Sequence, residues 1–259
     1  MIILANLKYW ELFLMNNRMH NRGDMMSTFN WSAEAEKLWD ENSESWNAKS
    51  AAMWEEGSRK DIISFFEKHV KKGSAVCDLG CGDGYGSYKL ALAGYRVIGI
   101  DVSEEMIHKA EKLNEKTGVV FKKEDISDLT LEENALDAVL AINSLEWTES
   151  PLDVLKEIRR TVKPGGRACI GILGPTAAPR ANSYRRLYKE KVICNTMMPW
   201  EFERLAKENG WLKIDELGVY KKASDQLSKG SLTDELKQSL SFMWIFMLEN
   251  KKNEGMGKE

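Results

Sequence analysis

A short segment rich in glycine and aspartate has the composition of a loop that binds a nucleotide-like ligand. Residues 76–86 read Val-Cys-Asp-Leu-Gly-Cys-Gly-Asp-Gly-Tyr-Gly and follow a helical stretch. Gly80 and Gly82 can adopt positive φ and place no Cβ in the path of a ligand. A helix that starts just after such a loop presents free N–H groups to a carboxylate or a phosphate. The segment therefore predicts a ligand-binding loop between a strand and a helix.

The spacing of these glycines excludes two nucleotide-binding loops. A dinucleotide-binding GxGxxG pattern that starts at Gly80 requires glycine at position 85, which is Tyr85. A pattern that starts at Gly82 requires glycine at position 87, which is Ser87. No Gly-Lys-Ser/Thr follows, so the segment is not a Walker loop. The spacing therefore argues against an NAD-dependent oxidoreductase.

Two more aspartates follow the next two β-rich runs. Asp101 ends VIGID, and Asp125 ends FKKED. The carboxyl ends of parallel strands meet at one edge of an open α/β sheet, so both carboxylates should lie beside the glycine loop. Each also has a simpler explanation, because Asp101 could favour a helix start through the macrodipole and Asp125 could cap the turn before Leu129.

Short β-rich runs alternate with helical stretches from Arg59 onward, which predicts βαβ units and a mostly parallel sheet. Ser103 is expected to cap a helix. Residues 163–166 predict a turn, and residues 179–195 predict an inserted helical segment. The predicted strands are 74–79, 95–100, 119–124, 136–142, 167–173 and 212–220, and the predicted helices are 58–71, 85–93, 104–116, 151–162 and 199–210. Residues 242–248 form either a last strand or a helix, and their length and their run of aromatic and aliphatic residues favour a strand.

The glycine loop and the two acids, in this order, resemble the DxGxGxG loop and the following strands of class I S-adenosylmethionine-dependent methyltransferases. The resemblance continues through residues 136–147 and 154–172 and covers roughly residues 58–175. It implies an α/β, Rossmann-like fold, with a mostly parallel seven-stranded sheet and helices on both faces. It also implies an N-terminal helical lid, an inserted helical segment after the fifth strand, and S-adenosyl-L-methionine as the cofactor.

The resemblance further implies roles for single residues. Asp101 would accept both ribose hydroxyls, Asp125 would accept the adenine amino group, and the N–H of Ile126 would donate to a ring nitrogen. Val102 and Met106 would flank the adenine. The implied cofactor-binding set is Asp78, Gly80, Cys81, Gly82, Asp101, Val102, Met106, Asp125, Ile126 and Asn143.

Four tryptophans recur every seven or eight residues, at positions 31, 39, 46 and 54. If 32–57 is helical they share one face, which is either the packing surface of a cap or a lid over the cofactor. Arg59 is expected to be a solvated helix charge, and pairing with the cofactor carboxylate is the alternative. The expected domains are an extension over 1–26 that is disordered or precedes the start site, a helical cap over 27–57, and the S-adenosylmethionine-binding domain over 58–259.

No motif fixes the methyl acceptor. Residues 175–200 contain five lysines and arginines interleaved with Tyr184 and Tyr188, so they could bind phosphate, stack on bases or form a solvated helix. The place of an Asn-Pro-Pro-Tyr motif reads Asn-Ser-Leu-Glu over 143–146, and many relatives carry a histidine pair where this chain has Glu146 and Trp147. We expect a small-molecule acceptor. A tRNA or other macromolecular acceptor and a non-catalytic cofactor-binding protein stay open.

Methyl transfer is an in-line displacement at an activated carbon, so alignment and the exclusion of water matter most. A general base is needed only if the acceptor arrives protonated. Glu146 is the first candidate and Asp83 the second, but the sequence assigns no catalytic residue. Asn143 and Cys81 have structural explanations as well, the latter as a small residue inside the loop.

The composition is that of an ordinary globular protein. The net charge of −3 and the hydrophobic fraction of 43% indicate neither nucleic acid nor a membrane surface as a partner. Cys77, Cys81, Cys169 and Cys194 lack disulfide-framework or zinc-site spacing, so no metal is expected. The expected location is cytoplasmic.

Overall fold

The computed structural model describes residues 29–225 and 228–251. The chain separates into two compact units, Met1–Asn30 and Trp31–Glu259, and the second is described here. The extension expected over residues 1–26 lies outside the described residues. Among the described helices, none combines the length and the apolar character that crossing a membrane requires.

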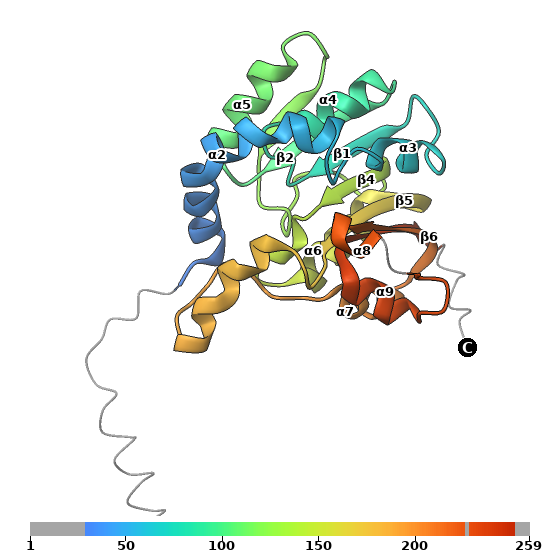
Figure 1. The fold of residues 1–259 in the computed structure, drawn as a ribbon. Coiled ribbons are helices and arrows are strands. Elements are labelled where there is room, and N and C mark those ends of the chain that lie inside the picture. The colour runs from blue at the N-terminus through green and yellow to red at the C-terminus, as the bar shows by residue number, and fades with distance from the viewer. Residues whose placement is uncertain (1–28, 226–227, 252–259) are drawn as a thin grey trace, which may run out of the picture. The chain divides into compact units, whose positions relative to one another are not determined.

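A seven-stranded sheet in the order β3-β2-β1-β4-β5-β7-β6 forms the centre of this unit (Figure 1). Strands β1 to β5 run parallel, and β7 lies antiparallel between β5 and β6. This confirms the predicted sheet, including its last strand. The strands are β1 Ala75–Leu79, β2 Arg96–Asp101, β3 Val120–Lys123, β4 Leu136–Ile142, β5 Val162–Leu173, β6 Trp211–Tyr220 and β7 Ser241–Asn250.

Helices cover both faces of the sheet (Figure 1). Ser103 caps α5 by accepting a hydrogen bond from the Met106 N–H at 3.1 Å, as predicted. Ser150 caps α6 in the same way through the Asp153 N–H. The α-helices are α2 Trp31–Glu55, α3 Ile62–Glu67, α4 Tyr85–Leu92, α5 Glu104–Asn114, α6 Pro151–Thr161, α7 Pro199–Glu208, α8 Lys222–Asp225 and α9 Asp234–Leu240, and the 3₁₀ helices are η1 Leu145–Trp147 and η2 Ala178–Tyr188.

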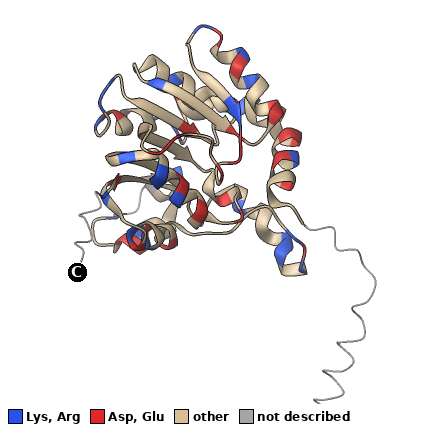
Figure 2. Cartoon of the chain, turned by 180° about the vertical axis from the view of Figure 1, so that it is seen from behind, with Lys and Arg blue, Asp and Glu red and all other residues tan. Residues whose placement is uncertain are grey.

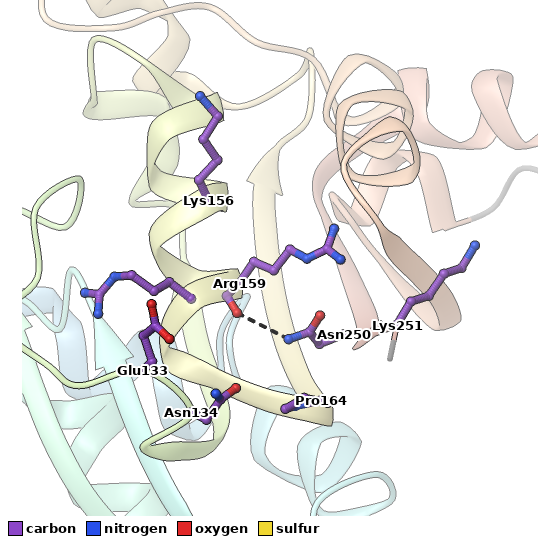
Figure 3. Close-up of a pocket in the computed structure, with 8 residues that line it drawn as sticks. Glu133, Asn134, Lys156, Arg159, Pro164, Asn250 and Lys251 are labelled. Carbon is purple, nitrogen blue, oxygen red and sulfur yellow. Dashed lines mark hydrogen bonds between the residues drawn. The ribbon is translucent and has the colours of Figure 1, made fainter. Parts of the chain in front are cut away.

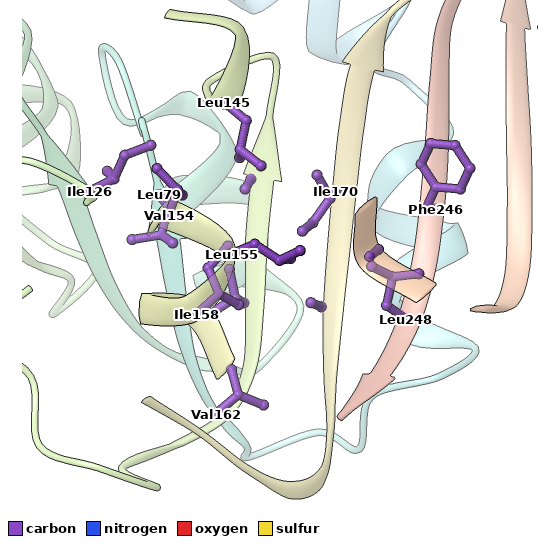
Figure 4. Packing of buried hydrophobic residues seen from close by; sticks show 14 of the residues in the cluster. Leu79, Ile126, Leu145, Val154, Leu155, Ile158, Val162, Ile170, Phe246 and Leu248 are labelled. Carbon is purple, nitrogen blue, oxygen red and sulfur yellow. The ribbon is translucent and has the colours of Figure 1, made fainter. Parts of the chain in front are cut away.

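The first layer of the core lies between the sheet and the helices α6 and α7. Apolar residues at i, i+1 and i+4 of α6, namely Val154, Leu155 and Ile158, are fully buried against β1, β4 and β5 (Figure 4). Phe202 of α7 meets Phe246 of β7 with 5.4 Å between ring centroids. This packing holds the carboxyl ends of the parallel strands in a fixed arrangement.

The second layer covers the opposite face. Ile62 and Phe66 of α3 and Leu90 of α4 are fully buried there, and Trp54 joins them from the end of α2. Phe66 contacts Tyr95 edge to face at 5.3 Å. Helix α2 is therefore joined to the sheet through its C-terminal end.

Three local elements differ from expectation. The helix expected over 58–71 is limited to α3, Ile62–Glu67, with turns on both sides. Residues 163–166 were expected to turn, but β5 already begins at Val162, and a register shift against β4 takes up the irregularity. The inserted segment forms the 3₁₀ helix η2 and not an α-helix. Sequence periodicity does not separate these outcomes, because they depend on pairing and packing with distant residues.

Candidate functional site

The glycine loop turns at the carboxyl end of β1 with positive φ at three glycines. Gly80, Gly82 and Gly84 have φ values of 68°, 55° and 76°. A Cβ on Gly80 would lie 2.4 Å from the Cβ of Ser144, so only glycine fits there. The N–H groups of Gly80 and Cys81 donate to the Ile100 carbonyl at 2.8 and 3.0 Å, which ties the loop to β2.

Asp101 lies between this loop and the start of α5. Its carboxylate accepts the Gly82 N–H at 2.8 Å and the Ser103 N–H at 3.0 Å. Burial raises the pKa of Asp101, and these backbone donors offset part of the rise. The structure thus brings the predicted acid at the end of β2 against the predicted glycine loop.

Asp78 is buried near the carboxyl end of β1. Its Oδ2 accepts the Ser87 hydroxyl at 2.7 Å. Burial raises the pKa of Asp78 to about 6, although Ser87 and the charge of Arg59 act in the opposite direction. A carboxyl group of this kind can bind a cation that enters the site.

Arg59 is buried in the site, so the expectation of a solvated helix charge is wrong. Its side chain lies over the rings of Trp46 and Trp54, with its central carbon 4.7 and 5.5 Å from the ring centroids. The residue is 8% exposed because these two indoles of α2 cover it. Burial lowers the pKa of Arg59 to about 10, and the charges of three carboxylates, Asp78, Asp83 and Glu146, oppose this.

The tryptophans of α2 lie over the carboxyl edge of the sheet. Trp39 contacts Trp46 and Trp147 edge to face, with 5.7 and 5.2 Å between centroids. A Cβ on Gly82 would lie 3.2 Å from Trp46 Nε1, so this indole covers the glycine loop. The Trp31 indole N–H donates to the Trp147 carbonyl at 2.6 Å.

Polar contacts hold α2 against the loops of the site. Asp83 accepts the Ser50 hydroxyl at 2.8 Å and the Asn47 amide at 3.0 Å. Asp40 accepts the Ser103 hydroxyl at 2.5 Å and the Glu105 N–H at 3.2 Å. Asp83 therefore helps to hold α2 in place, and Asp40 does so too, although no sequence motif marked Asp40 for this role.

The acid after β3 forms a local turn. Asp125 accepts the Ser127 N–H at 2.9 Å and its hydroxyl at 2.7 Å. Burial acts to raise the pKa of Asp125, but the hydrogen bonds from Ser127 and Ser32 together lower it. The carboxylate is half-buried and charged, and it lies at the same edge as Asp101, because β3 pairs in parallel with β2.

The remaining residues of the implied cofactor-binding set differ in how far they are buried. The Ile126 and Met106 side chains are buried, and Ile126 belongs to the core below the loop, so they pack inward, while Val102 is partly exposed. Cys81 is buried, and burial raises the pKa of its thiol well above the ordinary value. Asn143 has a φ of 56°, and its carbonyl accepts the Trp147 indole N–H at 2.8 Å.

A hollow of about 630 Å³ lies at the opposite edge of the sheet (Figure 3). It borders the residues before β4 and at the start of β5, where the parallel strands begin. Arg160 is engaged by Glu157 and the Leu131 carbonyl, and Arg159 donates to Asn209. The lining residues are Glu133, Asn134, Lys156, Arg159, Arg160, Pro164, Asn250 and Lys251.

Among the residues that the structure describes, no group of three or more His, Cys, Asp and Glu side chains has the arrangement of a metal site. The acids of the glycine-loop edge instead face backbone N–H groups, hydroxyls and one buried guanidinium.

The comparisons with known proteins agree with this geometry. Residues 77–170 match the family model described as a methyltransferase domain. A ubiquinone biosynthesis O-methyltransferase of Chromobacterium violaceum is 30% identical over 147 residues, which are 55% of this chain and 60% of that protein. The chain spans between 34% and 60% of the length of the first curated relatives that it matches.

Solved structures share the fold. A putative methyltransferase in complex with the Trm112 activator, from Haloferax volcanii, aligns with a TM-score of 0.64 at 17% identity, over 83% of this chain and 99% of that one. A putative S-adenosylmethionine-dependent methyltransferase from Listeria monocytogenes aligns with a TM-score of 0.56 at 20% identity, over 73% and 96%. Residues 77–170 therefore match a methyltransferase domain, and the sheet around them has the fold of solved S-adenosylmethionine-dependent methyltransferases.

Proposed function

We propose that this chain transfers a methyl group from S-adenosyl-L-methionine to a small-molecule acceptor. The observation that carries the proposal is the pairing of the glycine loop with Asp101, whose carboxylate meets the Gly82 N–H at 2.8 Å beside a turn that excludes any Cβ. A nucleoside with a ribose diol fits this pair, because a carboxylate can accept both hydroxyls.

The charges of the site fit the two ends of the amino-acid part of the cofactor. The buried guanidinium of Arg59 suits its carboxylate, and the carboxyl of Asp78 suits its ammonium group. Asp125 at the end of β3 suits the adenine amino group. The bound cofactor supplies a methyl carbon activated by a sulfonium, and Trp46 and Trp39 exclude water from that region.

Aromatic side chains favour a small acceptor. Trp39 contacts both Trp46 and Trp147, and these rings lie at the carboxyl edge next to η1. Enclosure by large apolar rings is typical of a pocket that takes a small molecule. An extended polymer requires an open, charged groove instead.

The test has two steps. Calorimetry with S-adenosylhomocysteine should show binding, and NADH should show none. The protein with tritiated S-adenosylmethionine should then label the small-molecule fraction of a cell extract and leave the RNA and protein fractions unlabelled. Absence of S-adenosylhomocysteine binding would overturn the proposal, and binding without transfer to any fraction would indicate a non-catalytic binding protein.

A macromolecular acceptor is the second candidate, and one surface favours it. Tyr184, Leu187 and Tyr188 of η2 are 52%, 67% and 59% exposed. Arg185 lies over the Tyr188 ring at 4.8 Å, and Figure 2 shows basic residues along this projecting segment. Charge reversal at Arg186 and Lys189 should abolish labelling of RNA if RNA is the acceptor, and S-adenosylhomocysteine affinity should stay unchanged.

A further inference from the structure

The turn that follows β4 buries two polar atoms that have no hydrogen-bond partner in the described part of the chain. They are the hydroxyl oxygen of Ser144 and the Oε2 atom of Glu146. Buried polar groups in proteins are nearly always hydrogen-bonded, so each exception calls for a physical reason. The two exceptions lie within three residues of each other, at the edge of the sheet where ligands bind in open α/β folds.

The backbone carbonyl of Glu146 and its other carboxylate oxygen, Oε1, are both hydrogen-bonded. Its Oε1 accepts the Leu173 N–H at 2.5 Å, at the end of β5. Its own carbonyl accepts the Asn195 N–H at 2.8 Å, where the inserted segment returns to the core. The residue is 0% exposed. One carboxylate oxygen is therefore held by the Leu173 N–H, and the other is buried without a hydrogen-bond partner among the described residues.

The charged groups that face Glu146 leave that oxygen without an ion-pair partner. The Asn143 side chain acts on the carboxylate in the direction that lowers the pKa of Glu146, but its amide donates to the Gly171 carbonyl at 3.4 Å. Arg180 of η2 acts on it electrostatically, but its guanidinium donates to the carbonyls of Leu173, Gly174, Thr196 and Met197. Arg59, which precedes α3, also acts on it from a distance while it stacks on the indoles of α2. The Cys194 thiol is the third titratable group on this side.

The turn borders the cofactor cradle directly. Ser144 contacts Gly80, because a Cβ there would come within 2.4 Å of the Ser144 side chain. Trp147, the next residue after Glu146, packs against Trp39 of α2. Glu146 thus lies between the glycine loop, the tryptophans that cover it and the root of η2.

We propose that Glu146 is the acceptor-binding carboxylate, and that its Oε2 accepts a hydrogen bond from an N–H or O–H on the atom to be methylated. The acceptor class is accordingly an amine or a hydroxyl compound. This inference rests on the proposed methyl transfer. It adds a residue and an acceptor chemistry that neither the family match nor the fold assigns.

Glu146 also receives the proton that the reaction releases. The acceptor nitrogen or oxygen forms its bond to the methyl carbon while the carbon–sulfur bond breaks, and the electron pair of that bond stays on sulfur. The proton of the acceptor passes to Glu146 Oε2 and leaves to solvent before the next turnover. Burial raises the pKa of Glu146, which makes the carboxylate a better base near neutral pH.

The experiment compares Glu146→Gln with Glu157→Gln. Glutamine keeps an acceptor oxygen for the Leu173 N–H but removes the basic carboxylate. We expect unchanged affinity for S-adenosylhomocysteine and a loss of tritium transfer to small molecules of about 100- to 10,000-fold. Glu157, whose carboxylate is engaged by Arg160 and the Leu129 N–H, should give the opposite pattern, with lower stability and unchanged transfer.

A second readout does not depend on the acceptor. An acid whose pKa is raised by folding loses stabilising effect as the pH rises through that pKa, so Glu146→Gln should hold or raise Tm at pH 8. Transfer by Glu146→Gln at the wild-type rate, or a Tm several degrees lower at pH 8, would overturn the inference. A wild-type protein that binds S-adenosylhomocysteine but labels nothing would instead overturn the proposed function itself.

Discussion

Asp101 orders the scaffold of the site and is also the residue that we propose binds the ribose of the cofactor. Two backbone N–H groups, from Gly82 and Ser103, donate to different oxygens of its carboxylate. Each carboxylate oxygen can accept a further hydrogen bond, so these contacts orient the group without exhausting it. If Asp101 binds the ribose diol as proposed, its carboxylate is already oriented before the ligand arrives.

Replacement of Asp101 by Ala tests this role. Loss of a charged bidentate acceptor should weaken S-adenosylhomocysteine binding by about 2–4 kcal/mol, measured by calorimetry. Asp101→Asn is the control that keeps the shape and one acceptor oxygen, and it should lose less. An Asp101→Ala protein that is folded and binds with wild-type affinity would remove Asp101 from the site.

Arg59 offers a test that separates the two ends of the cofactor. Arg59→Met keeps an apolar stem against Trp46 and Trp54 but removes the charge. S-adenosylhomocysteine should bind about tenfold or more weakly, because a charge-assisted hydrogen bond contributes about 1.5–3 kcal/mol. Methylthioadenosine has no carboxylate and should bind equally to both proteins. If both ligands lost the same affinity, Arg59 would act only by packing against α2 and not by binding the cofactor carboxylate.

At the scale of elements, α2 is joined to the domain by buried polar contacts as well as by tryptophans. Ser50 and Asn47 both donate to the buried carboxylate of Asp83, in the loop that leads to α4. Asp40 reaches the start of α5. The helix thus couples the glycine loop to the turn after β2, the two segments that would surround the nucleoside.

Removal of one of these contacts should destabilise the protein measurably. Ser50→Ala leaves one oxygen of the buried Asp83 carboxylate without its donor, and the free energy of unfolding should fall by about 1–3 kcal/mol. Urea denaturation measures the change. Ser45→Ala is the matched control, since Ser45 is exposed on the same helix and its hydroxyl accepts a hydrogen bond from the exposed Lys49. An equal change in the free energy of unfolding for the two substitutions would show that the Ser50–Asp83 hydrogen bond does not stabilise the protein.

The sequence was most informative where chain-local patterns decide the structure. The strands that flank the glycine loop, the Ser103 cap and the order of acids after β2 and β3 all follow from periodicity and spacing. The burial of Arg59 did not follow, because it depends on two indoles from a different helix. The contacts of Asp40 and the unpartnered oxygen of Glu146 could not be predicted either, because both depend on which distant residues the fold brings near them.

At the scale of the whole molecule, buried acids make the stability of the unliganded protein depend on pH. Burial raises the pKa of Asp78 to about 6, and it also raises the pKa values of Asp101 and Glu146. Each raised pKa means that the folded state holds its proton more tightly than the unfolded chain does. The stabilising effect is complete below the unfolded pKa and is lost as the pH rises through the folded pKa.

Tm should therefore fall between pH 5.5 and pH 8 in the absence of ligand. The Asp78 shift corresponds to about 3 kcal/mol at most, from about two pH units at roughly 1.4 kcal/mol each. The fall should be smaller in Asp78→Asn, and S-adenosylhomocysteine should raise Tm more at pH 8 than at pH 5.5, because its ammonium group favours the charged carboxylate. A Tm that rises across this range would contradict the assignment. Scanning calorimetry at several pH values measures the Tm of the wild type, of Asp78→Asn and of the protein with S-adenosylhomocysteine.

The position of β7 has a consequence for how the protein is made. This strand is translated after every other strand of the sheet, yet it lies between β5 and β6. While β7 is still inside the ribosome, β6 has no strand to pair with, and the backbone N–H and C=O groups on one edge of β5 are unpaired. Strands β1 to β5, which carry the proposed nucleoside site, can assemble early. The sheet is complete only when residues near 250 have left the exit tunnel and β7 can pair with β5 and β6. During that interval the edges are open to wrong partners, so chaperones should matter most for the last stretch of synthesis.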